Sequence, residues 1–281
     1  MTRTSGISWP YQEHARIAQV NGQIWSIQRW GTGPRVLFLH GTGASAHSWA
    51  PLLSVLNGAV DALSVDLLGH RLTPRPRRGH SSLSHMTQGL AAVCSAQEFT
   101  PDLIVGHSAG AVIAVDLAEQ LNTRSVLSIN GAFGAFPGPF HSLFSTAAQV
   151  MAATRLSAIV LSGLAQNRAR VERLLKNTGS NVPQAQLNYY HALFKDPEHV
   201  GGVLQFMADW NIKPFLKRLP HVARPVHFLS SAGDKTIPPS LSASWSNKLA
   251  HSTRTSVPRY GHLVHEEAPS EIAAIIHQMV P

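Results

Sequence analysis

One serine in the chain has neighbours that suit nucleophilic catalysis. Residues 106–110 read Gly-His-Ser-Ala-Gly, a G-x-S-x-G pattern with Ser108 at its centre. The apolar run at 103–105 predicts a buried strand before it, and the run at 111–118 predicts a helix after it. A serine on so sharp a strand-to-helix turn has strained backbone angles and projects its hydroxyl above the sheet. The pattern therefore predicts a serine nucleophile.

A serine nucleophile needs a general base, and the base needs a carboxylate that orients it. Asp234 directly follows the apolar run at 226–230, and His262 follows a strand expected near 253–257. Taken alone, Asp234 is explained equally well as a turn or helix-capping residue, and His262 as a packed loop histidine. Their order behind the serine, each after a late strand, favours a catalytic triad of Ser108, Asp234 and His262.

A glycine-rich loop supplies a candidate oxyanion hole. The segment His40-Gly41-Thr42-Gly43 follows the apolar run at 36–39, which is expected to be a central strand. A backbone N–H in this loop can face a developing oxyanion from the side opposite the Ala109 N–H. Such a donor typically contributes roughly 3 kcal/mol to the transition state. Thr42 is the predicted donor, with Gly43 as the alternative if the loop register differs.

The same loop has a second interpretation. Residues 41–46 fit G-x-G-x-x-A after a strand, and Asp66 ends the next strand, where a ribose-binding acid would lie. That would indicate a dinucleotide-binding oxidoreductase, but it leaves Ser108, Asp234 and His262 unexplained. We therefore favour the hydrolytic interpretation, and predict neither a cofactor nor a metal because no histidine pair and carboxylate occur at ligand spacing.

Four further histidines lie near these motifs. His40 and His107 are expected to have structural roles beside the two turns. His265 follows His262 by three residues and is the alternative general base. His70 could contact substrate, on the strength of its position alone.

Strands alternating with helices would position these residues. Strands are expected over 24–29, 36–40, 62–65, 103–105, 125–129, 226–230 and 253–257, after an extended lead-in over 1–21. Helices are expected over 49–56, 84–97, 111–118, 239–250 and 270–280. This alternation predicts an α/β fold with a mostly parallel central sheet flanked by helices.

The alternation stops between about residues 135 and 219. Helical patterns occur there, such as 168–177 and 185–194, and no strand-like run interrupts them. We interpret 135–219 as a helical cap inserted into a core formed by residues 1–134 and 220–281.

Composition limits the classes of function. Hydrophobic residues make up 44% of the 281 positions and charged residues 14%, which favours a well-buried globular body over a disordered chain. No apolar stretch reaches the roughly 18 residues of a spanning helix, and the N-terminus lacks a signal-peptide core. The single cysteine, Cys94, excludes an internal disulfide. A cytoplasmic location is expected.

The net charge of +8 is concentrated in a basic loop, which we define as Arg71–His80 and which contains no acidic residue. We interpret it as a solvated segment; the alternatives are contact with an acidic partner, an anionic membrane surface or a carboxylate-bearing ligand. No nucleic-acid-binding motif accompanies the charge, so nucleic acid is not an expected partner.

Together these motifs resemble the α/β-hydrolase superfamily. Nearly the full length resembles a closer family, the magnesium chelatase accessory proteins (BchO) of bacteriochlorophyll biosynthesis. The similar segments are Trp9-Pro10, 40–45 with Ser48-Trp49, 106–110, and 173–180 and 206–210 in the predicted cap. The cap segments are the most specific, because caps differ widely between hydrolases. Residues 67–71, Leu-Leu-Gly-His-Arg, depart from the Pro-Gly-His-Gly that is more common in the superfamily, which leaves the roles of His70 and Arg71 open.

The resemblance implies an α/β-hydrolase fold and an apolar or tetrapyrrole substrate. Trp49, Phe136, Phe206 and Trp210 are the aromatic residues expected to line its pocket, although ordinary core packing also explains each. Two functions follow as hypotheses. One is a serine hydrolase that cleaves an ester in bacteriochlorophyll biosynthesis. The other is a non-catalytic porphyrin-binding or assembly factor for magnesium chelatase or another pigment-pathway protein, with peripheral membrane contact as a further expectation.

Overall fold

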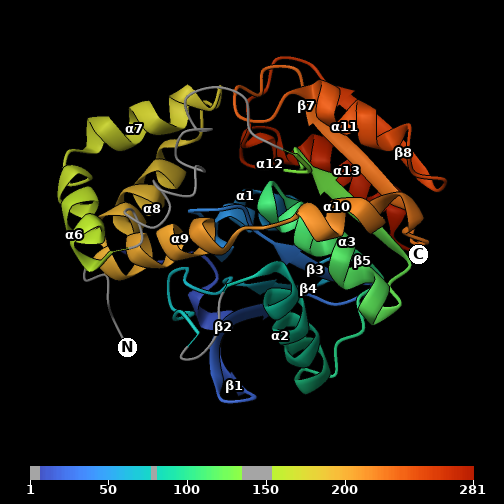
Figure 1. Cartoon of the computed structure of the whole chain (residues 1–281), viewed down its shortest axis with the longest axis horizontal. Helices are drawn as coiled ribbons and strands as arrows, with labels where there is room; N and C mark the ends of the chain where they lie inside the picture. The colour runs from blue at the N-terminus through green and yellow to red at the C-terminus, as the bar shows by residue number, and fades with distance from the viewer. Residues whose placement is uncertain (1–6, 77–80, 135–153) are drawn as a thin grey trace.

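An eight-stranded sheet forms the centre of the computed structural model, which describes residues 7–76, 81–134 and 154–281 (Figure 1). Its strands lie in the order β1-β2-β4-β3-β5-β6-β7-β8. The pairs β1–β2 and β2–β4 are antiparallel, and the remaining pairs are parallel. The predicted fold class is therefore confirmed. The strands are β1 Ala15–Val20, β2 Gln23–Trp30, β3 Arg35–Leu39, β4 Asp61–Val65, β5 Leu103–His107, β6 Ser125–Ile129, β7 Val226–Ser231 and β8 Ser252–Val257.

Strand β1 is the one strand that differs from the sequence-based expectation of an extended lead-in. It forms a hairpin with β2 through Asn21 and Gly22, which have φ values of 50° and 78°. An Asn-Gly pair is favoured in two-residue hairpin turns because both central positions need a positive φ. The pair was therefore a usable signal for this hairpin.

Helices cover both faces of the sheet. They are α1 Ala50–Leu56, α2 Leu83–Ala96, α3 Ala109–Leu121, α11 Pro239–Ser246, α12 Val264–Glu267 and α13 Pro269–Met279, with the short 3-10 segments η1 Gln12–His14, η2 Ala46–Trp49 and η3 Leu219–His221. Strand β3 is buried on both faces: Leu37 and Leu39 pack in the core beneath α2 and α3, whereas Val36 and Phe38 pack with α1 and α13. This explains its continuously apolar sequence.

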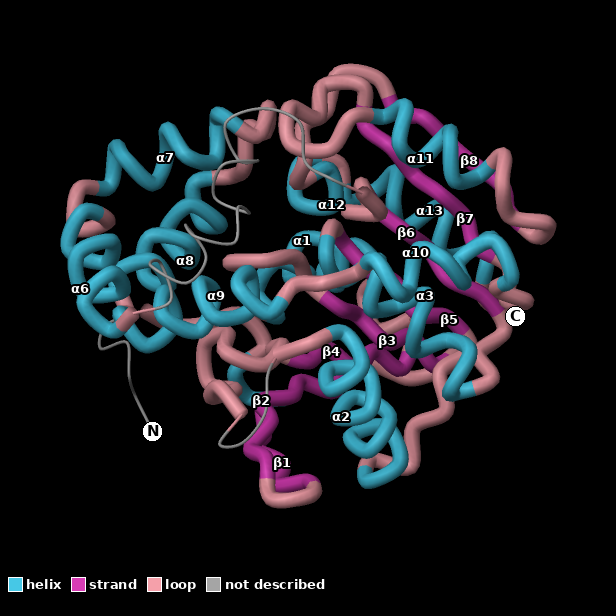
Figure 2. Tube along the Cα trace, in the orientation of Figure 1, coloured by secondary structure: helices cyan, strands magenta, loops and turns pink. Residues whose placement is uncertain are grey.

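Between β6 and β7 the described residues form five α-helices and the 3-10 segment η3, and no strand. The α-helices are α6 Arg155–Leu164, α7 Arg168–Asn177, α8 Gln184–Lys195, α9 Pro197–Asp209 and α10 Lys213–Arg218. Figure 2 shows α6–α9 grouped beside the sheet. Because residues 135–153 lie outside the described part, the cap boundaries stay a prediction.

Across the three described ranges, no helix is both long enough and apolar enough to span a membrane. The expected cytoplasmic location is not addressed by this finding and stays a prediction.

Candidate active site

Ser108 lies at the turn between β5 and α3, with φ 53° and ψ −116°. A positive φ is strained for a residue with a side chain, and such strain is typical of functional turns. The flanking glycines make the turn sterically feasible. A Cβ on Gly106 would lie 2.3 Å from the Gly110 carbonyl oxygen, and one on Gly110 would lie 2.1 Å from the Leu39 carbonyl oxygen. The G-x-S-x-G pattern is thus imposed by the close approach of three backbone segments.

We expect Gly110→Ala to lower the free energy of unfolding by about 3 kcal/mol or more, because the new methyl group meets rigid backbone. Gly163→Ala is the matched control. Gly163 lies in α6, and a Cβ added there would have no neighbouring atom within 4 Å, so alanine should stabilise the helix by up to about 1 kcal/mol. Urea denaturation measures both. Equal unfolding midpoints for the wild type and Gly110→Ala would contradict the steric argument.

The predicted acid and base are in contact. His262 Nδ1 lies 2.7 Å from Asp234 Oδ2, and both side chains are buried. Because a carboxylate can only accept, Nδ1 carries the proton and Nε2 is left as the basic nitrogen. Asp234 Oδ1 accepts the N–H groups of Thr236 and Ile237 at 2.7 and 2.9 Å, which fixes the carboxylate.

Ser108 and His262 lie on neighbouring backbone segments. The ring of His107, the residue before the serine, lies 4.6 Å from the ring of His262, and its Nε2 is 2.9 Å from the His262 carbonyl oxygen. The described contacts include no hydrogen bond from the Ser108 hydroxyl to His262. In ligand-free enzymes this bond is often long and tightens when substrate binds. The arrangement is compatible with a triad, whose catalytic role stays a prediction.

Asn130, just after β6, holds the histidine loop and was not identified from the sequence. Its Nδ2 donates to the carbonyl oxygens of His262 (2.9 Å) and Gly261 (3.3 Å). Its Oδ1 accepts the Ser231 N–H at 2.9 Å. One buried amide therefore ties the ends of β6 and β7 to the loop that carries His262.

A segment of the cap is hydrogen-bonded to both loops that carry the predicted acid and base. The Thr178 carbonyl oxygen accepts the N–H groups of His262 (3.3 Å) and Lys235 (3.1 Å). Gly179 has φ +87°, and a Cβ there would lie 2.1 Å from the Gly233 carbonyl oxygen. Ser180 Oγ accepts the Leu263 N–H at 2.8 Å. These residues end the cap motif 173–180 on which the sequence resemblance depended, and they contact the loops of both Asp234 and His262.

The predicted oxyanion loop is held by two imidazoles. The Gly43 N–H donates to His70 Nε2 (3.1 Å), and the Gly43 carbonyl oxygen lies 3.2 Å from His199 Nε2, on α9 of the cap. Since the Gly43 N–H is already used, the alternative donor is disfavoured. Neither the Thr42 nor the Ala109 N–H donates a hydrogen bond within the described ranges. Both stay predicted oxyanion donors, and Thr42 is exposed.

Burial keeps this pair of imidazoles neutral. It lowers the pKa of His70 and that of His199 to about 3, and the pKa of the adjacent His40 likewise. A neutral ring can accept a backbone N–H through one nitrogen and donate through the other, which a protonated ring cannot do. His40 Nε2 accepts the Leu67 N–H at 3.0 Å in the same way. The contacts of His70 and His199 with Gly43 could not be predicted from the sequence.

Arg71 corrects the interpretation of the basic loop as solvated. Its side chain is only 9% exposed, with Nη1 3.6 Å from Asp66 Oδ2 and the guanidinium carbon 4.2 Å above the Trp9 ring. Its N–H donates to His199 Nδ1 at 3.0 Å. Arg71 therefore joins the lead-in, the core and the cap. Arg75 is exposed, and residues 77–80 lie outside the described part.

The contacts of Asp66 also weigh against the dinucleotide interpretation. The carboxylate is fully buried, accepts the Ala46 N–H at 2.7 Å and faces Arg71. Its complete burial leaves the carboxylate out of reach of a ribose.

The four predicted pocket aromatics have different environments. Trp49 and Phe206 are 0% and 1% exposed and pack in the core, so a lining role is unsupported for both. Trp210 is half-buried with its ring 5.0 Å from Phe206, and Phe136 lies outside the described residues.

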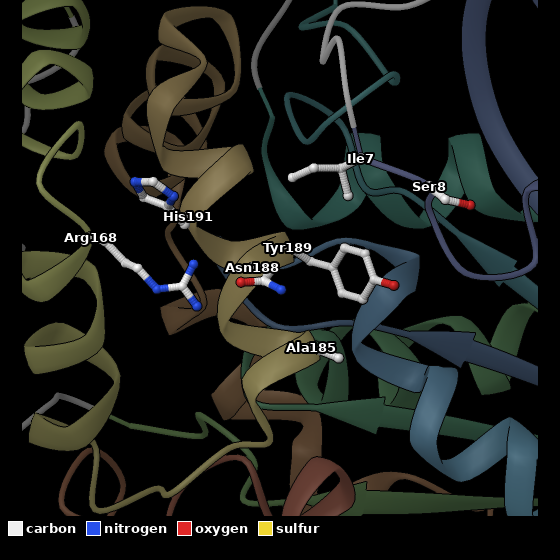
Figure 3. A pocket seen from close by; sticks show the side chains of 7 residues that line it. All are labelled: Ile7, Ser8, Arg168, Ala185, Asn188, Tyr189 and His191. Carbon is white, nitrogen blue, oxygen red and sulfur yellow. The ribbon is translucent and has the colours of Figure 1, made fainter.

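A hollow of about 440 Å³ lies elsewhere on the cap, beside α8 (Figure 3). None of the triad residues lines it. Its lining residues are Ile7, Ser8, Arg168, Ala185, Asn188, Tyr189 and His191.

A buried polar cluster behind the histidine loop was not predicted. Glu266 Oε1 accepts hydrogen bonds from Ser48 and from Tyr190 of the cap, the latter at 2.7 Å. His265 Nε2 lies 2.8 Å from Ser48 Oγ, and its ring is 4.4 Å from that of His107. Burial raises the pKa of Glu266 to about 8 and lowers that of His265 to about 3, so both are neutral at pH 7.

This cluster predicts a pH-dependent stability. Between pH 4.5, the ordinary pKa, and about 8, folded Glu266 keeps a proton that the unfolded chain releases. Its contribution to the free energy of unfolding therefore falls as pH rises, by up to about 1.4 kcal/mol per pH unit. Buried histidines act in the opposite direction up to and somewhat above pH 6.5, since their lowered pKa values make the unfolded chain bind more protons. The effect of Glu266 is therefore measured as a difference between variants. Between pH 6.5 and 8 the free energy of unfolding of wild type relative to Glu266→Gln should fall as pH rises, whereas relative to exposed Glu13→Gln it should stay level; parallel curves for Glu266→Gln and wild type would refute it.

The alternative base, His265, lies within this cluster and has no described contact with Asp234. We expect His265→Ala to lower the free energy of unfolding by about 2 kcal/mol, because it leaves a buried cavity, and to change kcat by less than about tenfold. Thermal denaturation and hydrolysis of a model ester measure the two effects. Loss of turnover in folded His265→Ala, with turnover kept in His262→Ala, would show that the wrong histidine has been assigned.

Comparison with known proteins gives consistent matches. The model of the alpha/beta hydrolase family matches residues 36–275. The magnesium-chelatase 30 kDa subunit of Rhodobacter capsulatus is 34% identical over 271 residues, covering 96% of this chain and 95% of that protein. An esterase of Mycobacterium tuberculosis is 34% identical over 116 residues, 41% of this chain and 37% of its own.

Solved structures share the fold. An alpha/beta hydrolase fold protein from Burkholderia ambifaria superposes with a TM-score of 0.79 at 19% identity, covering 96% of this chain and all of that one. An esterase from Exiguobacterium antarcticum gives a TM-score of 0.72 at 14% identity, covering 93% and 97%.

Proposed function

Because the chain belongs to the alpha/beta hydrolase family, we propose that it is a serine hydrolase that cleaves an ester. The observation that carries the proposal is the 2.7 Å contact between Asp234 and His262, on loops after β7 and β8, beside the strained turn of Ser108. A serine nucleophile requires a strained turn that presents its hydroxyl and a base that is held by an acid. The turn of Ser108 and the buried pair of Asp234 and His262 supply both at one edge of the sheet.

In the proposed reaction, His262 Nε2 takes the hydroxyl proton as Ser108 Oγ attacks the ester carbonyl carbon. The Thr42 and Ala109 N–H groups stabilise the oxyanion that forms. Collapse of this intermediate breaks the bond to the alkoxy group, which leaves as an alcohol with the proton from His262. Water, deprotonated by His262, then attacks the acyl-enzyme and releases the carboxylic acid and free Ser108.

The proposed substrate class is an ester of a pigment-pathway intermediate. Its support is the similarity over nearly the whole chain to a protein named as a magnesium-chelatase subunit. The cap helices α8 and α9, which contact the oxyanion loop through Phe194 and His199, would form the substrate-facing surface. A tetrapyrrole ester is a broad apolar ligand with an ester at its edge, which suits a capped site.

A fluorophosphonate probe tests the nucleophile directly. The wild-type protein should be labelled on Ser108, as located by peptide mass spectrometry, whereas protein unfolded in urea beforehand should not react. Absence of labelling in folded protein would contradict the hydrolase proposal. Labelling at another serine would show that a different residue is the nucleophile.

A second candidate function is a non-catalytic factor that binds a porphyrin or assists magnesium chelatase. The specific observation in its favour is that the relative with 34% identity over 96% of this chain is named as a magnesium-chelatase subunit rather than as a hydrolase. Titration with magnesium protoporphyrin monomethyl ester separates the two functions. Tight binding without turnover, unchanged in Ser108→Ala, would favour the second; hydrolysis of the ester would favour the first.

A further inference from the structure

Helix α6 of the cap has its small residues buried and its large aliphatic residues exposed. Its buried residues are Ala158 and Ser162, followed by Ala165 just after the helix. Its five large aliphatic side chains are between 42% and 70% exposed: Leu156, Ile159, Val160, Leu161 and Leu164. A helix that packs on a protein core normally shows the opposite pattern, with its aliphatic face inward.

The narrow buried face has a clear partner. Helix α6 packs along α9, where a Cβ on Gly201 would lie 3.3 Å from the Ala158 Cβ. Small residues are needed there so that the two helices can approach closely. The large aliphatic residues are therefore not required for docking α6, and they form a contiguous stripe, because positions 156, 159, 160 and 164 repeat at helical spacing.

This stripe, defined as the five aliphatic residues above, lies at the outer edge of the molecule. Figure 1 shows α6 and α7 on the side of the cap away from β7 and β8. On α7, Leu174 is a further aliphatic side chain of the cap that is exposed. Contiguous exposed apolar surface of this kind usually marks a contact with a membrane or a partner.

The charges on α6, α7 and the turn between them are almost all positive. Residues 154–177 contain five basic side chains and one acidic one, Glu172, which is paired with Lys176 at 2.8 Å. On α7, Arg170 and Leu174 are four residues apart and share one helix face, so a positive charge lies beside an exposed aliphatic side chain on this helix. The charge complement of such a surface is anionic.

From these observations we propose that α6 and α7 form an interfacial surface that binds an anionic lipid membrane, with the stripe inserted among the acyl chains and the arginines on the headgroups. Helices with aliphatic residues on one side and arginine or lysine beside them bind lipid surfaces by adding apolar burial to electrostatic attraction. The surface belongs to the cap. Helix α6 contacts α9 through Ala158 and Gly201, and α9 also carries His199, which contacts the predicted oxyanion loop.

Vesicle co-sedimentation tests the proposal with the full-length chain. Wild type should bind vesicles of equal phosphatidylglycerol and phosphatidylcholine far better than vesicles of phosphatidylcholine alone, and raised salt should weaken the binding. The combined variant Ile159→Ser, Val160→Ser and Leu164→Ser should lower partitioning by about a hundredfold. Arg170→Gln with Arg173→Gln should lower it by about tenfold on anionic vesicles only.

Two controls keep the result specific. Val55→Ser removes an aliphatic side chain that is 42% exposed on α1, outside the cap, and should leave partitioning unchanged. Ser108→Ala should also bind normally, so that failure of the hydrolase proposal and failure of this one are distinguishable. Circular dichroism should show that the stripe variants fold, since none of the three positions belongs to a hydrophobic core cluster of the described residues.

Three outcomes would overturn the proposal. Wild type could fail to bind anionic vesicles, or the stripe variant could bind as well as wild type. Sedimentation velocity could instead show a wild-type dimer that the stripe variant converts to monomer without any vesicle binding. The stripe would then be an interface between two copies of the chain.

Discussion

Ser108→Ala should lower kcat for a p-nitrophenyl ester by about a millionfold, the loss found when the nucleophile of a serine protease is removed. The methyl side chain cannot form the acyl-enzyme, so only oxyanion stabilisation and substrate binding would remain. The fold should be unaffected, because the strained backbone at φ 53° already accommodates a Cβ at this position. Steady-state hydrolysis, with thermal denaturation as the check on folding, measures the effect.

Ser128→Ala is the matched control for this loss. Ser128 is fully buried on β6, paired in register with Gly106 of β5, and its hydroxyl has no hydrogen-bond partner within the described residues. Its replacement should therefore leave both turnover and stability nearly unchanged. Comparable activity in Ser108→Ala and wild type would mean that any hydrolysis observed does not use Ser108.

Asp234→Asn should lower kcat by about ten-thousandfold. The amide can retain the bonds from Thr236 and Ile237 at the Oδ1 position, so the loop should keep its shape. At the Oδ2 position, however, an NH2 group would face His262 Nδ1 and favour the tautomer that has its proton on Nε2. That tautomer cannot accept the serine proton.

Asp61→Asn controls for the loss of a carboxylate. Asp61 lies at the start of β4 and forms an ion pair with Arg29, at the end of the sheet opposite to the candidate site. The substitution should therefore reduce stability slightly and leave kcat unchanged. Steady-state kinetics should measure kcat for Asp234→Asn, Asp61→Asn and the wild type. A loss below tenfold in Asp234→Asn would show that another group orients His262.

The elements that carry the candidate site could be predicted because they depend on local patterns. Apolar runs identified the strands, and the residues that follow strands in a parallel sheet converge on one edge. Ser108, Asp234 and His262 were predicted in this way, without any knowledge of distances. The Asn-Gly hairpin was equally local, although its signal was not used.

The residues that hold these groups in place could not be predicted, because their partners are remote in sequence. His199 contacts Gly43 across 156 positions, and Asn130 contacts the His262 loop across 132. Nothing in the local sequence of either residue distinguishes it from an ordinary buried side chain. Helix α6 lies within the region expected to be helical, and its aliphatic residues repeat at helical spacing; the sequence could not show that this apolar face is exposed rather than packed on the core.

The cap insertion has a consequence for how the chain folds during synthesis. Strand β6 pairs with β7 in a register that joins Val126 to Val226, so one edge of the growing sheet stays unpaired while about a hundred residues are translated. An open parallel edge can pair with the wrong strand or with another chain. The pairing of β6 with β7 joins residues about a hundred positions apart, and such long-range pairing is expected to form slowly. Ser108 is therefore synthesised before β6, β7 and β8, and it can meet Asp234 and His262, its predicted acid and base, only after the segment that carries them has been translated.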